Sequence, residues 1–149
     1  MKILLYIGLL LLVCFLPVQG TDVGELIPVE VIAVSESDGM VTVRTDTGEQ
    51  GSGSTLQTAF EDLKNTTAGV IYLDTAEYVL LEPGNEEWIP VLRKYLKEDT
   101  KVCEAEENIG IDVIANYLSV HHPGICLKDA EEVERMPVIV VQSGRYRME

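Results

Sequence analysis

Two strand-like segments joined by the dipeptide Asp38-Gly39 constrain the fold of this chain more than any other feature of its sequence. Residues 28–34 and residues 40–46 are rich in β-branched residues and alternate or run apolar, which is the pattern of β-strands. Asp-Gly between two such segments is the usual signal of a two-residue hairpin turn. The sequence therefore predicts an N-terminal β-hairpin over residues 28–46.

Helical and strand-like segments alternate through the rest of the chain. Apolar residues at helical spacing predict helices over residues 56–63, 88–96 and 108–120. Short apolar segments bounded by turn residues predict strands over residues 69–73, 77–81, 100–104, 136–141 and 145–148. We therefore expect a single α/β domain over residues 28–149, in which the N-terminal hairpin is followed by alternating helices and strands that form a mixed sheet with about three helices.

The first twenty residues differ from everything that follows them. Lys2 precedes an almost unbroken apolar segment over residues 3–16, and Pro17 to Gly20 resemble a cleavage region. This pattern predicts a signal peptide over residues 1–20, with an uncleaved membrane anchor as the alternative, and a linker over residues 21–27. Cys14 is a candidate for lipidation, although Val13 stands where lipoproteins normally have Gly, Ala or Ser. We expect an exported protein, secreted or on the outer face of the cytoplasmic membrane.

The charge of the chain limits the partners that it can bind. Its 149 residues include 25 acidic and 11 basic side chains, which give a net charge of −14. Such a field repels DNA, RNA and anionic lipid unless a basic patch is present. The basic residues are scattered through the sequence, apart from Arg93-Lys94 with Lys97 and Arg145 with Arg147, and they form no visible patch. We therefore expect no nucleic-acid partner and membrane contact only through residues 1–20.

The stretch from Gly48 to Thr55 has the spacing G-x-x-x-x-G-S-T of a phosphate-binding loop, but Ser54 occupies the position of the essential lysine. No basic residue lies between Arg44 and Lys64 to replace it. A structural interpretation explains the same residues. Gly51 and Gly53 would form a turn, and Ser54 with Gln57 has the S-x-x-Q pattern of a capping box at a helix start.

The remaining cysteines and the two histidines do not form a recognisable site. Export permits a disulfide between Cys103 and Cys126, and two buried free cysteines are an equally good interpretation. His121 and His122 lie at the predicted end of a helix, where imidazole is favourable, and the spacing of His and Cys fits no zinc motif. We predict no metal, no cofactor and no catalytic residue.

The segment Gly51-Ser-Gly-Ser-Thr-Leu-Gln-Thr-Ala59 resembles the run G-x-G-x-[ST]-[IL]-x-x-A of the Ger(x)C family, the C subunits of spore germinant receptors. The order of the predicted elements from Pro28 onward is similar to the amino-terminal domain of that family. The lipid-bearing cysteine of the family has no clear counterpart here. The resemblance implies a non-catalytic component of the cell envelope with protein partners at a membrane.

Two functions are consistent with the sequence. The first is a non-catalytic extracytoplasmic interaction module of the bacterial cell envelope, connected with sporulation or spore germination, whose partners are envelope or membrane proteins. The alternative is a secreted hydrolase that uses carboxylates or a metal held by histidine. An interaction module should present an exposed apolar patch or a free sheet edge, whereas a hydrolase should gather polar groups in a concave pocket.

Overall fold

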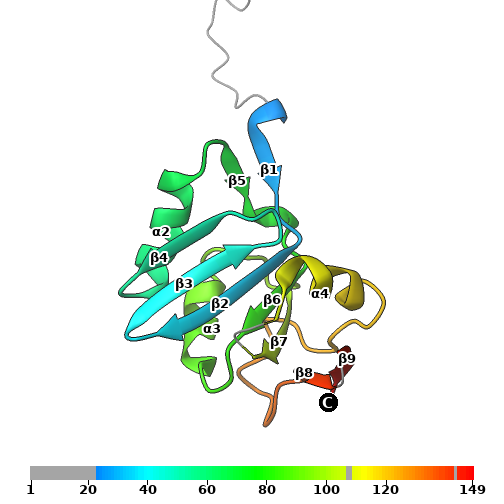
Figure 1. Ribbon diagram of the computed structural model, residues 1–149. Coiled ribbons are helices and arrows are strands. Elements are labelled where there is room, and N and C mark those ends of the chain that lie inside the picture. Colours follow the sequence, from blue (N-terminus) through cyan, green and yellow to red (C-terminus); the bar gives the residue numbers. More distant parts are fainter. Residues whose placement is uncertain (1–22, 107–108, 143) are drawn as a thin grey trace, which may run out of the picture.

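The computed structural model describes residues 23–106, 109–142 and 144–149, which form one α/β domain (Figure 1). The segment that we interpret as a signal peptide or anchor, including Cys14, lies outside these residues. None of the helices in the described ranges combines the length and the apolar character that crossing a membrane requires.

A seven-stranded mixed sheet is the centre of the domain. Its strands occur in the spatial order β4-β3-β2-β6-β7-β8-β9. The four central strands, β2, β6, β7 and β8, pair in parallel, whereas β3, β4 and β9 pair antiparallel at the two ends. The bounds of the strands are β2 Val31–Ser37, β3 Met40–Thr45, β4 Gln50–Gly53, β6 Tyr78–Leu81, β7 Lys101–Ala105, β8 Val138–Gln142 and β9 Arg145–Met148. The predicted fold class, a single α/β domain with a mixed sheet, is confirmed.

The predicted N-terminal hairpin is formed by β2 and β3. Asp38 and Gly39 connect the strands with φ values of 53° and 73°. Both central residues of a type I′ turn need positive φ, and Asp-Gly accepts this conformation at little cost. The turn therefore fixes the register that places Val34 opposite Val43.

Three α-helices cover the two faces of the sheet in the described part of the chain. Helices α2 (Leu56–Thr66) and α3 (Ile89–Leu92) pack on one face, and α4 (Ile111–Leu118) packs on the other (Figure 1). Strand β2 contributes to both cores because successive side chains point to opposite faces. Ile32 packs on the side of α2, and Val31 packs on the side of α4.

A small parallel sheet precedes and flanks this core. Strand β1 (Leu26–Pro28) pairs with β5 (Val70–Tyr72), and a 3-10 turn, η1 (Val23–Glu25), leads into β1. The linker predicted over residues 21–27 therefore overlaps η1 and the first two residues of β1. The two end residues of β5 are exposed, because only one of its faces meets the core.

The helix predicted over residues 88–96 is shorter than expected. A 3-10 turn, η3 (Glu86–Trp88), leads into α3, and another, η2 (Leu73–Thr75), precedes β6. Pro90 lies in the first turn of α3, where its missing N–H costs nothing. Leu92 and Leu96 still turn toward the core, so the apolar stripe is preserved although the regular helix is not.

Candidate interaction surface

The glycine-rich stretch forms the edge strand β4 instead of the predicted turn. Gly51 and Gly53 do not have positive φ, and their role is to let α2 lie directly on the strand. A Cβ on Gly51 would overlap the backbone carbonyl oxygen of Ala59 and the amide nitrogen of Leu63. The tight turn is made earlier in the sequence, at Gly48, whose φ is 91°.

The outward N–H of Ser52 in β4 is not free to bind a phosphate. The N–H of Ser52 points away from β3 and donates to Oδ2 of Asp62 on α2, at 2.9 Å. A carboxylate thus occupies the position that an anion would need, and it repels a second negative charge. The phosphate-loop interpretation therefore has neither a lysine nor a free backbone donor at this position.

The helix cap lies one residue later than predicted. Thr55, not Ser54, is the N-cap of α2, and its hydroxyl accepts from the N–H of Thr58 at 3.2 Å. The Thr58 hydroxyl accepts from the N–H of Thr55 at 3.0 Å, so the capping box consists of two threonines. Gln57 instead bonds Glu61 along the exposed face of the helix, at 3.1 Å. The S-x-x-Q pattern therefore predicted the wrong cap. The hydroxyls of Thr55 and Thr58 accept the two backbone N–H groups that a capping box satisfies.

The two histidines contact tyrosines at the end of α4. His122 Nδ1 lies 2.6 Å from the hydroxyl of buried Tyr78, and the ring of His121 lies 4.6 Å from that of Tyr117. Burial, with a smaller effect of the Glu77 carboxylate, raises the pKa of Tyr78, so the phenol keeps its proton. Within the described part of the chain, no three His, Cys, Asp or Glu side chains gather closely enough to hold a metal ion.

Cys103 and Cys126 are both free thiols in the structure. Cys126 lies directly opposite Lys101 in an isolated antiparallel bridge, and Cys103 is two residues further along the same face of β7. The two cysteines are therefore diagonal neighbours, with Cα atoms typically about 7–8 Å apart. A disulfide needs about 4.4–6.8 Å between these atoms, so the geometry favours the interpretation of two free cysteines over the disulfide.

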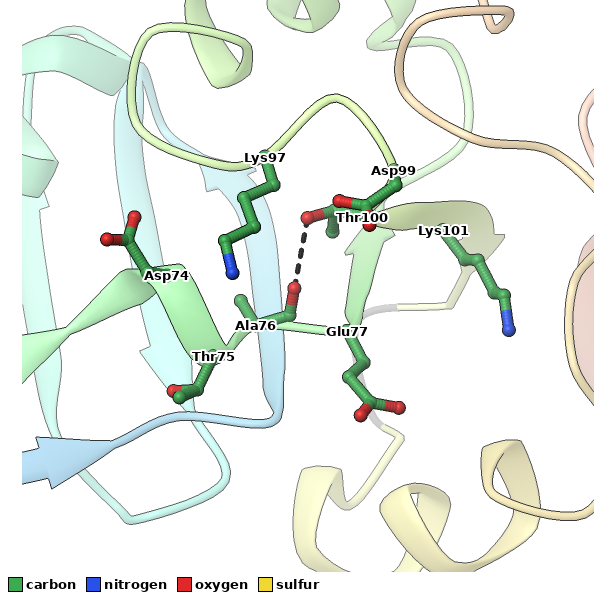
Figure 2. Close-up of a pocket in the computed structure, with 8 residues that line it drawn as sticks. All are labelled: Asp74, Thr75, Ala76, Glu77, Lys97, Asp99, Thr100 and Lys101. Carbon is green, nitrogen blue, oxygen red and sulfur yellow. Dashed lines mark hydrogen bonds between the residues drawn. The ribbon is translucent and has the colours of Figure 1, made fainter.

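A hollow at the amino ends of β6 and β7 has a volume of about 450 Å³ (Figure 2). Its hydroxyl groups bond the protein itself. The Thr100 hydroxyl donates to the carbonyl oxygen of Ala76 at 3.0 Å. The Thr75 hydroxyl donates to that of Tyr72 at 2.8 Å and accepts from the N–H of Val29 at 3.0 Å. Both threonine hydroxyls of the hollow are therefore already hydrogen-bonded to the protein.

The charged groups around this hollow do not converge. Figure 2 shows the ammonium groups of Lys97 and Lys101 pointing in different directions, and acidic side chains stand between and beside them. Ligands of α/β sheets usually bind at the carboxyl ends of the parallel strands. At that end, a hollow between β2, β6 and β7 has a volume of only about 10 Å³, roughly the room that one water needs.

The two edges of the seven-stranded sheet differ. Strand β4 is covered by α2, whereas β9 ends the sheet with no further strand in the part of the chain that the structure describes (Figure 1). Val138 and Glu149 exchange both backbone hydrogen bonds, at 3.0 and 2.9 Å. Because bonded and non-bonded pairs alternate in an antiparallel ladder, the backbone groups of Tyr146 and Met148 point outward from the sheet.

An exposed apolar surface adjoins this edge on the side of α4. Tyr146 packs against Tyr117 with ring centroids 5.8 Å apart. The neighbouring Val141 on β8 is 47% exposed, and Val113 on α4 is 52% exposed. We call these four side chains, together with the outward backbone of β9, the β9 surface. Sequence analysis predicted the strand but could not reveal that it is an open edge, because its place in the sheet depends on long-range pairing.

Comparison of the chain with protein-family models, with curated proteins and with solved structures finds no match.

Proposed function

We propose that this chain is a non-catalytic, extracytoplasmic interaction module of the bacterial cell envelope, connected with spore germination, and that it binds a protein partner through the β9 surface. The observation that carries this proposal is the open edge of β9. An edge strand with outward N–H and C=O groups is a template for a strand of another protein. Partly buried tyrosines and exposed valines beside that edge add the apolar contact that protein interfaces need at their centre.

Two further observations support the proposal. The apolar segment over residues 3–16 has the character of an export signal, which would deliver the domain to the envelope. The similarity of residues 51–59 to the Ger(x)C run supports the link with germination. The hydrolase alternative gains no support from the hollow of Figure 2, because its hydroxyls bond the backbone and its lysines point apart.

A pair of substitutions in β9 tests the proposal. Met148→Pro removes the outward N–H of the edge without touching a bond to β8, and proline is tolerated on edge strands. Met148→Val loses a similar part of the side chain but keeps the N–H, so it is the matched control. In native cells that carry each variant as the only copy, we expect slower germination with Met148→Pro and normal germination with Met148→Val.

A photo-crosslinking residue at Arg145 should form an adduct with a protein of the envelope fraction in the same cells. The same residue at Asn65, at the exposed end of α2, should form none. Equal germination of the proline and valine strains, with no adduct at Arg145, would refute the proposal. Thermal melts of both purified variants are the control that each one is folded.

A further inference from the structure

We infer that the β9 surface accepts an extended partner strand in which acidic and apolar side chains alternate. This inference rests on the proposed function, because it names the chemistry of the partner that binds the same edge.

The backbone of β9 sets the position of such a strand. Tyr146 and Met148 direct their N–H and C=O groups outward, and they are separated by one residue. A partner strand can therefore form hydrogen bonds at both residues and continue the ladder of the sheet. In that arrangement, partner side chains lie opposite those of β9 and alternate between the two faces with the same period of two residues.

The two faces of β9 differ in chemistry. Tyr146 and Met148 pack toward the core under α4, next to exposed Val141. Arg145 and Arg147 therefore project from the opposite face, and both are exposed. A partner strand would meet apolar side chains at every second position and guanidinium groups at the positions between.

These two arginines concentrate positive charge on one short strand of an acidic chain. The sequence has 11 basic residues against 25 acidic ones, yet two of the basic residues fall within the four residues of β9. Oε1 of Glu149 lies 3.8 Å from Nε of Arg147, and both side chains are more than half exposed. This ion pair therefore leaves Arg147 accessible to a partner. Solvent at physiological salt screens charges beyond about 8 Å, so the local arginines and not the net charge select the partner. Carboxylates at alternate positions complement them.

A second copy of the chain is a poorer occupant. In the antiparallel register that pairs Tyr146 with Met148 of the other copy, Arg145 faces Glu149 of that copy, but Arg147 faces Arg147, and like charges directly opposite each other destabilise a strand pair. An acidic strand from a different protein avoids that contact and places a carboxylate opposite both arginines. Charge complementarity thus favours an acidic strand from a different protein.

Two labelled peptides test the inference in binding assays with the purified full chain. The acidic probe is acetyl-Val-Glu-Val-Glu-Val-Glu-Val-amide, and the basic probe has Lys in place of each Glu. We expect the wild-type protein to bind the acidic probe roughly five- to tenfold more tightly than the basic one, as two exposed cross-strand ion pairs allow. The double variant Arg145→Glu, Arg147→Glu should reverse the preference. Met148→Pro should weaken binding of the acidic probe, and Met148→Val should not.

The outcomes separate this inference from the proposed function. Preference of the wild-type protein for the basic probe, or an unchanged preference in the double variant, would overturn the inference. If Met148→Pro nevertheless slows germination in cells, the β9 surface remains the interface and only the partner chemistry is wrong. If the proline variant has no effect on the probes or in cells, both proposals fail. A concentration-dependent dimer that Met148→Pro dissolves would identify a second copy as the occupant and would also overturn the inference.

Discussion

The carboxylate of Asp62 accepts a hydrogen bond of 2.9 Å from the backbone N–H of Ser52, and this contact joins helix α2 to the edge strand β4. The outward N–H of an edge strand is a liability, because it can recruit strands of other molecules. Asp62 satisfies that N–H from within the domain. The sheet therefore has one edge that is capped by its own helix and one edge, β9, that is open.

Replacing Asp62 by Ala should leave this N–H without a protein acceptor. We expect the free energy of unfolding to fall by about 1 kcal/mol, because the contact is only partly buried and water replaces part of it. Amide exchange at Ser52 should become faster. Asp62→Asn keeps an acceptor oxygen and should recover most of the loss in a urea titration. Equal stability of the wild-type, alanine and asparagine proteins would contradict the role of Asp62.

The cap of α2 can be located by comparing neighbouring positions. Thr55→Ala removes the hydroxyl that accepts from Thr58, and we expect a loss of about 1 kcal/mol, as is typical for a lost N-cap. Ser54→Ala should change stability by less than about 0.5 kcal/mol, because surface substitutions away from such contacts are nearly neutral. Urea denaturation of both variants decides between the two positions. A larger loss with Ser54→Ala would restore the cap that the sequence pattern suggested.

Gly51→Ala should be among the most destabilising single-methyl changes in the protein. The added Cβ would overlap backbone atoms of α2, which cannot move aside as a side chain can. We expect a loss of about 1–3 kcal/mol, the usual cost of overpacking. Gly124→Ala is the matched control, because a Cβ there meets nothing within 4 Å. Thermal melts that show equal effects of the two substitutions would argue against close packing of α2 on β4.

Stability at alkaline pH should depend on the buried thiol of Cys103. Burial, with a smaller effect of Glu104, raises the pKa of this thiol from 9.0 to about 12. The thiol thus stays protonated in the folded protein while it ionises in the unfolded chain above about pH 9. Below about pH 9 the thiol is protonated in both states, and its stabilising contribution is complete. As pH rises toward 12, ionisation of the thiol in the unfolded chain lowers the free energy of unfolding by up to about 4 kcal/mol.

Cys103→Ala provides the measurement. The variant is less stable at about pH 8, because it leaves a small cavity, but its stability should fall less steeply with pH. Urea titrations at about pH 8 and about pH 11 should therefore show the gap between wild type and variant narrowing or reversing. Tyr78, whose pKa is also raised, is present in both proteins and cancels in the comparison. If the stabilities of the wild type and Cys103→Ala fell in parallel with pH, the thiol would have the same pKa in the folded and unfolded states, and the prediction would be wrong.

The sequence by itself determined the local structure of this protein. Asp38-Gly39 specified the hairpin because its turn type needs positive φ at both residues, and the spacing of apolar residues from Leu56 to Leu63 specified the face that α2 buries. The same reasoning placed the cap one residue early, because Ser54 and Thr55 are both good caps and only the path of the chain into the helix chooses between them.

Only the tertiary structure decided that Gly51 lies in a strand under α2 and that β9 is an open edge of the sheet. Glycine followed by serine is typical of a turn, and Gly51 became part of a strand because α2 folds back over it and leaves no room for a Cβ. The four residues of β9 look like any closing strand in the sequence. They form an open edge because β8 is their sole neighbour in the described sheet, and that depends on pairings between segments far apart in the chain. Local propensity carries no information about such pairings, so the position of the candidate surface is a property of the folded domain.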